Sequence, residues 1–596
     1  MEPLYDSSQL KFHTLAELIR DSANKFAERP IIGTKTHGQY QWITYSEFDL
    51  QMRKFRTLMK KAGLKKGERV AVIANNSVEF ALTVYAAYGL GGIIVPMYEF
   101  QKLQDWEFIF SDSKPMLAVV GNDSIREKIE GLQCESIKQI YVINPSDHSK
   151  ALSELISQET EFTEIMDDLT EDDISDIIYT SGTTGRPRGV VLTHKNIVEN
   201  VKITTARFPI GPTDRLLTFL PWAHAFGKTV ELHLFLAVGA ALGLAESTRT
   251  IQDDLLQVNP TILNSVPKIF CKIYDKIHLM MENSKSKRFL LEYTENIAQK
   301  NRAGSASLLD KMQFAILDRA IAGKIRAAFG NSLRFCISGG ASLSPKVMQF
   351  FENFGIKIYE GYGMTEHAPI ITVNNPTLKK IGSVGRALPN VKIEILHDND
   401  ALDKSDEKCG EIVVTSDCIM KEYYNSPDAT SEAIDEQGRL HTGDMGYLDD
   451  DGCLWITGRV KEQYKLENGK YVVPTALEDK INNSTMIAQA VIFGAGKPYN
   501  IVLIRPADEF IAKFKEDNKL NHASQAVLES NAKLRELIYN ELQTICADFR
   551  GYEKPQKFTI VLDDFTIENG LITPALKIKR REIEKRFADK IAALYE

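Results

Sequence analysis

The amino-acid sequence predicts an α/β protein with a large N-terminal domain of doubly wound sheets, a β-hairpin subdomain and a small α+β C-terminal domain. Three observations support this class. Continuous apolar runs alternate with helical segments up to about residue 360, apolar and polar residues alternate between turn signals after residue 382, and the pattern changes again near residue 460. Strand–helix–strand order is typical of parallel sheets, whereas strict alternation is typical of hairpins. A chain of 596 residues is also too long for one compact domain.

Apolar runs mark the first strands. Residues 13–29 have the spacing of an amphipathic helix, and Arg69 leads into the run VAVIA, which is typical of a buried parallel strand. A helical segment at 77–90 and the run IIVPM come next, followed by LAVV at 117–120 and QIYVI at 139–143. We therefore expect these strands to form a doubly wound sheet.

The same order recurs twice further along the chain. RLLTFLP after residue 214 is followed by an expected helix over 228–238 and by the run ALGLA. LRFCISGG then precedes a helix that we expect to begin at Ser344-Pro345, because a capping residue followed by proline suits a first helical turn. KIYEGYG is the strand expected after that helix.

The character of the sequence changes near residue 382. GSVGRALPNVKIEIL, CGEIVVTS and GCLWITGR alternate apolar and polar residues between turn signals, which predicts β-hairpins. GRV at 458–460 is the expected boundary between an N-terminal domain, 1–459, and a C-terminal domain, 460–596. In the second domain we expect strands near 489–493 and 500–504, a charged helical stretch at 505–548 and a basic tail.

Charge and cysteine content argue against some classes of protein. The formal net charge of -8 argues against a nucleic-acid partner, because the chain has no basic excess for counterion release. The seven cysteines are scattered and never form a CxxC pair, so we interpret them as reduced thiols of a cytoplasmic protein. The apolar runs at 85–98 and 234–245 fall short of the ~20 residues that a spanning helix needs, and the N-terminus does not resemble a signal peptide. Peripheral contact with the inner face of a membrane is left open.

The stretch IIYTSGTTGRPRGVVLTHKN at 177–196 is the strongest local signal for chemistry. It is not a Walker A motif, because Val190 follows Gly189 where that motif has Lys and then Ser or Thr. Its glycines, hydroxyls and cation still suit an anion, because successive backbone N–H groups can surround a phosphate. The alternative is a solvated Gly/Thr turn, but seven positions of SGTTGxPxG occurring together make chance a poor explanation.

At these residues the chain resembles the adenylate-forming superfamily of acyl-CoA synthetases, firefly-type luciferases and peptide-synthetase adenylation domains. Four more motifs of that superfamily follow in family order: YEGYGMTE at 359–366, HTGD at 441–444, GRVKEQYKLENGKYVVP at 458–474 and LITPALKIKR at 571–580. The resemblance covers nearly the whole chain. SVPKIFCKIYDKI at 265–277 and the long segment 280–330 look most like long-chain fatty acid–CoA ligases.

The resemblance implies an ATP site. Its expected ATP- or AMP-binding residues are Thr180, Ser181, Gly182, Thr183, Thr184, Gly185, Arg188, Gly340, Glu360, Gly361, Tyr362, Gly363, Asp444 and Arg459. The loop would hold the β- and γ-phosphates, Tyr362 would stack on adenine, and Asp444 with Arg459 would hold the ribose. Arg188 departs from the family, which usually has Lys there; the positive charge is kept, so we expect ATP binding to survive.

The resemblance also implies a magnesium site and catalytic residues. Glu366, with Thr184, would bind Mg²⁺, which prefers carboxylate and phosphate oxygens, and Thr365 would contact the α-phosphate. Lys577 matches the catalytic lysine, whose ammonium would offset the repulsion between a carboxylate and the α-phosphate.

Three further residues are assigned by the same resemblance. His224, in LPWAHAFG, would gate the acyl carboxylate, with a buried structural histidine as the alternative. Lys461 matches the family's hinge residue, and Gly469 lies in the loop that would face coenzyme A. The C-terminal domain is expected to be mobile and to swing between the two half-reactions.

The implied reaction activates a long- or medium-chain fatty acid with ATP as acyl-AMP and then transfers the acyl group to coenzyme A. Two alternatives stay open: an acyl-AMP ligase that loads a carrier protein, and a degenerate nucleotide-binding protein without activity. Acyl chain length and saturation, and a monomeric or homodimeric state, stay undetermined by the sequence.

Overall fold

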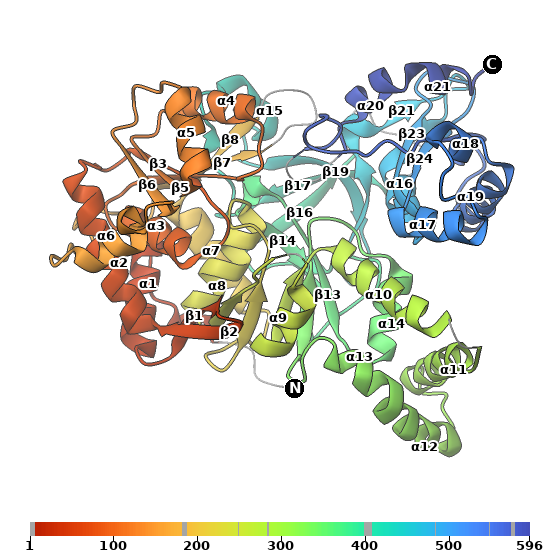
Figure 1. Ribbon diagram of the computed structural model, residues 1–596, viewed down its shortest axis with the longest axis horizontal. Helices are drawn as coiled ribbons and strands as arrows, with labels where there is room; N and C mark the ends of the chain where they lie inside the picture. The colour runs from red at the N-terminus through yellow and green to blue at the C-terminus, as the bar shows by residue number, and fades with distance from the viewer. Residues whose placement is uncertain are drawn as a thin grey trace.

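The computed structural model describes residues 6–180, 187–247, 249–282, 285–397, 408–482, 484–547, 549–573 and 578–596. Two large sheets and their helices make up most of the molecule, and the C-terminal region, blue in Figure 1, lies to one side of them at the upper right. The α/β class and the separate C-terminal region are therefore confirmed.

The first large sheet has seven strands in the order β18-β8-β7-β4-β3-β5-β6. Its parallel centre is built from the apolar runs that the sequence predicts, and its antiparallel edge is formed by β7, β8 and β18. The strands are β3 (Arg69–Ile73), β4 (Ile93–Met97), β5 (Leu117–Asn122), β6 (Gln139–Asn144), β7 (Ile174–Thr180), β8 (Arg188–Thr193) and β18 (Glu422–Tyr423).

The second large sheet has nine strands in the order β15-β14-β13-β12-β11-β9-β10-β1-β2. Its inner strands pair in parallel, whereas β2, β14 and β15 pair antiparallel at the edges. The hairpin of β1 and β2 is an addition that the sequence analysis did not foresee. The strands are β1 (Pro30–Thr36), β2 (Gln39–Thr44), β9 (Arg215–Thr218), β10 (Ala241–Leu244), β11 (Ile262–Ser265), β12 (Phe335–Ser338), β13 (Ile358–Gly363), β14 (Ile370–Val373) and β15 (Arg386–Ala387).

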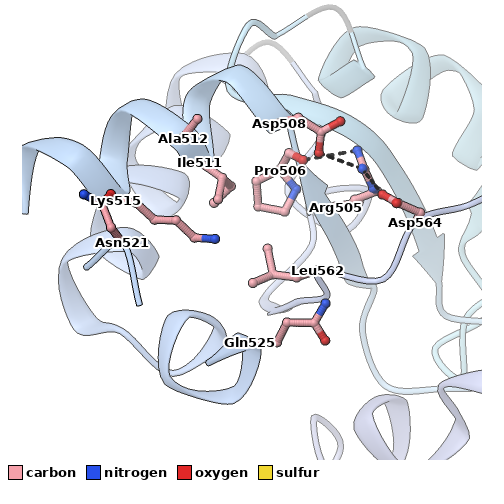
Figure 2. A pocket seen from close by; sticks show the side chains of 10 residues that line it. All are labelled: Arg505, Pro506, Asp508, Ile511, Ala512, Lys515, Asn521, Gln525, Leu562 and Asp564. Atoms are coloured by element: carbon pink, nitrogen blue, oxygen red, sulfur yellow. Dashed lines mark hydrogen bonds and ion pairs between the residues drawn. The ribbon is translucent and has the colours of Figure 1, made fainter. Parts of the chain in front are cut away.

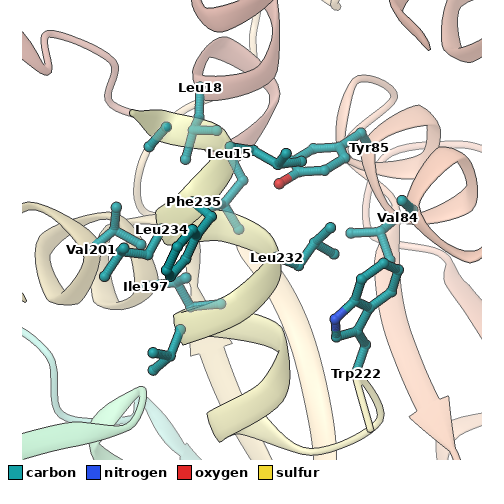
Figure 3. Close-up of a cluster of buried hydrophobic side chains, with 14 of the residues drawn as sticks. Leu15, Leu18, Val84, Tyr85, Ile197, Val201, Trp222, Leu232, Leu234 and Phe235 are labelled. Carbon is teal, nitrogen blue, oxygen red and sulfur yellow. The ribbon is translucent and has the colours of Figure 1, made fainter. Parts of the chain in front are cut away.

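The largest hydrophobic cluster joins the two sheets through the helices between them. Figure 3 shows part of it, to which different helices contribute side chains such as Leu15, Tyr85 and Phe235. The first of these helices, expected over 13–29, is present but shorter, and it begins after Thr14 because this residue and Glu17, the third of the helix, form a reciprocal capping box. The helices are α1 (Leu15–Phe26), α2 (Tyr45–Lys61), α3 (Val78–Tyr88), α7 (His194–Thr205) and α8 (Leu234–Ala237).

Other helices cover the outer faces, which completes the doubly wound arrangement. α4 (Leu103–Ser113) and α5 (Asp123–Gly131) pack on the seven-stranded sheet. α9 (Ile251–Val258), α10 (Pro267–Glu282) and α14 (Pro345–Asn353) pack on the nine-stranded sheet. The last of these has proline in its first turn, as expected.

The expected helix over 228–238 has a different form. Residues Phe226–His233 form a π-helix that continues into α8. Its i→i+5 bonding widens the helix directly after the segment LPWAHA, and π-turns of this kind are frequent at functional sites. The apolar spacing of this segment does not distinguish the two helix types, because nearly every side chain in it is buried.

The predicted hairpins after residue 382 form an antiparallel sheet in the order β16-β17-β19-β20. The strands are β16 (Lys392–Leu396), β17 (Gly410–Thr415), β19 (Leu440–Leu448) and β20 (Leu454–Arg459). Two parts of this sheet contribute to the candidate site: the start of β19, which holds the HTGD motif, and the end of β20.

The C-terminal region has its own three-stranded sheet, β23-β24-β25, with an apolar cluster on each face. The predicted charged helical stretch is three helices, α17, α18 and α19, and the basic tail is helical as well. The elements are β21 (Tyr464–Lys465), β22 (Tyr471–Val472), α16 (Pro474–Asn482), β23 (Ile487–Phe493), β24 (Ile501–Pro506), α17 (Asp508–Asp517), α18 (Gln525–Glu529), α19 (Ala532–Ile545), β25 (Lys557–Ile560), α20 (Arg580–Arg586) and α21 (Ala588–Ala592).

Among the helices that the structure describes, none combines the length and apolarity that a membrane crossing requires.

Candidate active site

Three of the motifs meet at one aspartate. The Tyr362 hydroxyl at the end of β13 donates to Asp444 Oδ2 over 2.6 Å, and Arg459 Nε lies 3.1 Å from Asp444 Oδ1. Asp444 and Arg459 are neighbours across the antiparallel pair β19–β20, so the sheet itself sets their spacing. The sequence predicts that these three residues share a site, and the structure brings them together.

The surroundings of this cluster fix the protonation state of Tyr362. Burial, followed by the neighbouring Asp444 carboxylate, raises the pKa of Tyr362 well above its usual value, so the phenol keeps its proton. The backbone N–H of Asp444 donates to Thr442 Oγ1 over 3.1 Å, which fixes the turn before it. A carboxylate has about four lone-pair sites, which is enough for several donors at once.

Glu366 lies in a short helical turn, Thr365–His367, directly after β13. Both Thr365 and Glu366 are buried. The Tyr423 hydroxyl donates to Glu366 Oε1 over 2.8 Å, and the Arg188 guanidinium carbon lies 5.6 Å from the centre of the Tyr423 ring. One tyrosine thus connects Arg188, at the start of β8, to the carboxylate expected to bind the metal ion.

The glycine-rich loop joins β7 to β8. Thr180 ends one strand, Arg188 begins the other, and the two are cross-strand partners. The Thr180 hydroxyl donates to the Arg188 carbonyl over 3.5 Å. The remaining loop residues with predicted phosphate contacts lie outside the described residues: Ser181, Gly182, Thr183, Thr184 and Gly185.

The glycines around the YEGYG strand allow close packing of the backbone. Gly340 has a left-handed φ of +85°, which favours glycine. A Cβ on Gly363 would collide with the Pro369 carbonyl, and one on Gly361 would lie 3.1 Å from the Thr372 carbonyl oxygen. Any side chain at 361 or 363 would therefore disturb the pairing of β13 with β14.

Glu360 differs from the other predicted nucleotide-binding residues because its side chain is turned to the protein. Its Oε1 accepts the backbone N–H of Leu343 over 2.8 Å. Burial raises the pKa of Glu360 to about 7, although that hydrogen bond opposes the shift. The group thus holds the loop after β12 and is protonated in slightly acidic solution.

His224 lies between the end of β9 and the π-helix. Its Nδ1 accepts the backbone N–H of Phe226 over 3.2 Å, so one ring nitrogen is used to begin the helix. A Cβ on Gly339 would lie 3.1 Å from the Phe226 ring, so this segment packs against the loop that contains Gly340. His224 is half-buried, which fits a role at the edge of a site better than one in the core.

The predicted hinge and the predicted thiol loop follow directly on β20. Lys461 is exposed in a single helical turn, Val460–Glu462. Gly469 is exposed in the turn between β21 and β22, where its φ is +79°. Neither residue joins the cluster around Asp444 through a contact that we identify among the described residues.

Lys577 lies outside the described residues. The chain on either side of it is held, because Ile572 and Ile578 form an antiparallel bridge and the Lys579 N–H donates to the Leu571 carbonyl over 2.9 Å. Upstream, an added Cβ on Gly570 would lie 3.2 Å from the ammonium of Lys102 in the N-terminal part. Gly570, seven residues before Lys577, therefore lies close to the residue that precedes α4.

Two sets of contacts made by residues of the C-terminal region were not foreseen in the sequence analysis. Arg580 donates to both oxygens of Glu478, over 2.7 and 2.6 Å, and to the Ile492 carbonyl over 2.6 Å. The Ser342 hydroxyl donates to Asp479 Oδ2 over 3.1 Å and so connects α16 to the loop after Gly340. The partners are 88 to 137 residues apart, and only the folded chain reveals them.

A cavity of about 440 Å³ lies in the C-terminal region, where Figure 2 shows Lys515 pointing into it and Arg505 held between Asp508 and Asp564. Its lining residues come from β24, α17, the connection to α18, α18 itself and the segment after β25. None of the predicted site residues lines it. The cavity is therefore separate from the cluster around Asp444 and Glu366.

Two family models and several curated proteins match this chain. The family model described as AMP-binding enzyme matches residues 19–424, and that described as AMP-binding enzyme C-terminal domain matches residues 461–596. The long-chain-fatty-acid–CoA ligase FadD15 of Mycobacterium bovis is 30% identical over 571 residues, which cover 94% of this chain and 93% of that protein. The peroxisomal long chain acyl-CoA synthetase 7 of Arabidopsis thaliana is 29% identical, covering 98% of this chain and 86% of the relative.

Solved structures share the fold. The adenylation domain of a carboxylate reductase from Mycobacterium chelonae matches with a TM-score of 0.75 and 22% identity, covering 99% of this chain and 93% of that domain. ATP-bound MatB from Rhodopseudomonas palustris matches with a TM-score of 0.72 and 21% identity, covering 98% and 100%. Likeness at this level of identity concerns the fold.

Proposed function

Because the chain belongs to the family of AMP-binding enzymes, we propose that it is an acid–thiol ligase that activates a long-chain fatty acid with ATP. The carboxylate attacks the α-phosphate, forming acyl-AMP and releasing pyrophosphate. The coenzyme A thiol then displaces AMP to give acyl-CoA. Dividing one difficult condensation into two easier steps is the usual benefit of an activated intermediate. The names of the two relatives given above support the acyl substrate class and the thiol.

The meeting of Tyr362, Asp444 and Arg459 is the observation that carries this proposal. An aromatic ring, a carboxylate and a guanidinium at the edge of a sheet suit a purine nucleoside, since the ring can stack on the base and the carboxylate can accept ribose hydroxyls. Glu366 follows Tyr362 closely in the sequence and is linked to Arg188 through Tyr423. The phosphates would follow the ribose toward these two residues. The order along the site is thus base, ribose, phosphate.

We place the phosphates against the β7–β8 connection. Thr180 and Arg188 bracket the loop 181–186, and the pairing of β7 with β8 fixes both of its ends. Backbone N–H groups of such a loop suit phosphate oxygens, and the guanidinium adds a forked donor. Arg188 stacked near Tyr423 would approach a β- or γ-phosphate with its charge intact.

Glu366 is the residue that fits Mg²⁺. Within the described ranges, no group of three or more His, Cys, Asp or Glu side chains could hold a metal ion alone. Magnesium commonly takes one or two protein carboxylates and completes its shell with water and substrate phosphates, so a single buried glutamate next to the phosphate position suits it, with Thr184 as the second proposed contact. A bound Mg²⁺ would neutralise the charge that develops on the leaving pyrophosphate.

The C-terminal domain, proposed as 460–596, would supply Lys577 for the first step. Its ammonium would reduce the repulsion between the acyl carboxylate and the α-phosphate, while His224 borders the carboxylate. Rotation at Lys461 would then replace this lysine by the loop at Gly469, beside which the thiol enters. The contact of Gly570 with Lys102 supports an arrangement in which the lysine segment faces the large domain, 1–459.

The compartment proposed is the cytoplasm. None of the seven cysteines, all of which the structure describes, forms a disulfide, which suits a reducing compartment. The partners that follow from the reaction are a fatty acid and coenzyme A, and no nucleic acid.

Mass spectrometry of products tests the proposal. Purified protein is incubated with MgATP, coenzyme A and a panel of C2 to C18 acids. We expect acyl-CoA, AMP and pyrophosphate, with the long acids preferred. Acyl-AMP without acyl-CoA would indicate a carrier-protein acceptor instead, and ATP binding without any product would indicate a degenerate enzyme.

A further inference from the structure

A two-helix arm stands out from the body of the molecule. It consists of α11 (Lys285–Arg302) and α12 (Leu308–Leu317), connected by residues 303–307. Figure 1 shows both helices projecting at the lower right, beyond α13 (Gly323–Ala327) and away from the large sheets. Neither helix contributes a residue to the site described above.

The outer surface of this arm is apolar. Leu308 is 83% exposed, Ile316 72% and Met312 69%. Such values are unusual for large apolar side chains gathered in one place, and exposed apolar patches of this kind mark interaction surfaces. The exposed apolar residues of the arm, here called the arm patch, are Phe289, Leu290, Tyr293, Leu308, Leu309, Met312 and Ile316.

The two halves of the arm patch lie side by side. The Tyr293 hydroxyl donates to Gln313 Oε1 over 2.8 Å, which joins the middle of α11 to the middle of α12. The rings of Phe289 and Tyr293 stack one helical turn apart, with centroids 5.9 Å apart. On α12, Leu309, Met312 and Ile316 recur at three- and four-residue spacing and so share one face.

The arm patch is not a by-product of core packing. α11 already has an inner face, whose buried residues include Leu291 and Ile297. α12, all ten residues of which the structure describes, has no buried residue at all. Phe314 and Leu317 are partly buried, whereas Leu308, Leu309, Met312 and Ile316 stay mostly exposed.

The arm carries positive charge in an otherwise acidic protein. Residues 285–317 contain six lysines and arginines against three acidic residues, whereas the whole chain has a net charge of -8. Arg288 lies near one end of α11 and Lys300 near the other, and Lys311 is on α12, whereas Arg302 is ion-paired with Glu352 of the body. Exposed Phe and Leu with neighbouring Lys and Arg are typical of helices that lie in a lipid interface.

We propose that the arm patch binds the surface of an anionic lipid bilayer. The apolar side chains enter the boundary between headgroups and acyl chains, and the surrounding basic residues pair with anionic headgroups. Charge complementarity and the convex, two-helix shape favour a lipid surface over a second protein, whose partner surface would need a matching groove. The inference goes beyond the proposed reaction and depends on the arm alone.

Vesicle flotation tests the proposal with the full chain. The vesicles are phosphatidylcholine with 30 mol% phosphatidylglycerol, or phosphatidylcholine alone, in low salt and in 0.5 M NaCl. The test variant is Leu308→Ser with Leu309→Ser and Met312→Gln, which changes side chains that are mostly exposed. A matched control changes Val527→Ser, Leu537→Ser and Tyr539→Ser, exposed apolar residues of α18 and α19.

We expect the wild type and the control to float with the anionic vesicles, and the arm variant to float at least fivefold less. Salt and the neutral vesicles should each reduce wild-type binding at least fivefold, as should Lys300→Glu with Lys311→Glu. Equal flotation of the arm variant and the wild type would overturn the proposal. So would no wild-type flotation, or a concentration-dependent dimer that the arm substitutions abolish. Acyl-CoA formation from a dissolved acid, measured without vesicles, reports separately on the proposed function.

Discussion

Replacing Arg580 by Gln should destabilise the C-terminal region and slow the first half-reaction. The guanidinium makes two hydrogen bonds to Glu478 and one to the Ile492 carbonyl, all between 2.6 and 2.7 Å. Glu478 is only 7% exposed. Removing one partner of a buried ion pair leaves the other charge uncompensated, which costs about 3–5 kcal/mol. Because 29% of the Arg580 side chain is exposed, we take the lower end, about 3 kcal/mol.

The thermal assay follows from that magnitude. For a region of 137 residues counted from 460 to 596, a loss of 3 kcal/mol corresponds to a fall in its melting temperature of roughly 10 °C. Arg580 begins α20, three residues after Lys577. A looser anchor should therefore lower the rate of acyl-AMP formation more than the rate of acyl transfer from supplied acyl-AMP.

A second variant makes this prediction refutable. Glu478→Gln added to Arg580→Gln removes the uncompensated charge, and its amide oxygen can still accept the Ile492 N–H that Glu478 accepts over 2.6 Å. The double variant should thus melt several degrees above the single variant. If Arg580→Gln melts with the wild type, or the double variant is less stable than the single one, the reasoning about the buried pair is wrong.

Three more predictions follow from the site. Lys577→Ala should abolish acyl-AMP formation and largely spare thioester formation from supplied acyl-AMP, measured as two separate half-reactions. Arg188→Lys should remain active in the complete assay, because the charge next to the phosphates is kept. Glu360→Gln should leave the melting temperature nearly unchanged at pH 4 and raise it at pH 8. The pKa of Glu360 is about 7 in the folded protein against an ordinary value of 4.5, so the folded state holds a proton that the unfolded state has lost, and stability falls as pH rises through this range. Ionising this group should cost roughly 3 kcal/mol at pH 8.

Each of these three has an outcome that contradicts it. Equal loss of both half-reactions in Lys577→Ala would argue against a lysine that serves only the first step. An inactive Arg188→Lys enzyme would show that the forked guanidinium, rather than its charge, is required. The same gap between Glu360→Gln and wild type at both pH values would show that the carboxyl does not titrate between them; the amide keeps the Leu343 N–H bond, so that bond is not the variable.

The sequence predicted the architecture well because its signals were local. The run VAVIA became β3, LAVV lies in β5, and the proline after Ser344 begins α14. The HTGD and YEGYG motifs gave both members of the Tyr362–Asp444 pair, the first near the start of β19 and the second at the end of β13. Periodicity sufficed wherever neighbouring residues decide the conformation.

What the sequence could not provide depends on distant partners. Tyr423 reaches Glu366 only because β18 pairs with β8, more than two hundred residues earlier. The β1–β2 hairpin and the π-helix at Phe226–His233 were likewise absent from the expectation, since alternation was weak in the first and apolar residues surround the second. The boundary at residue 459 and the roles of the site residues stay predictions.

The pairing of β18 with β8 determines how late in synthesis the seven-stranded sheet can be completed. The edge of the seven-stranded sheet next to the glycine-rich loop is covered by residues 422 and 423, whereas the strand it covers begins at residue 188. A nascent chain must therefore extend past residue 423 before this edge is closed, and until then β8 offers unpaired backbone groups to any other strand. Because late-synthesised segments complete an early-synthesised sheet, productive folding of the N-terminal part is coupled to synthesis of the segment beyond residue 420.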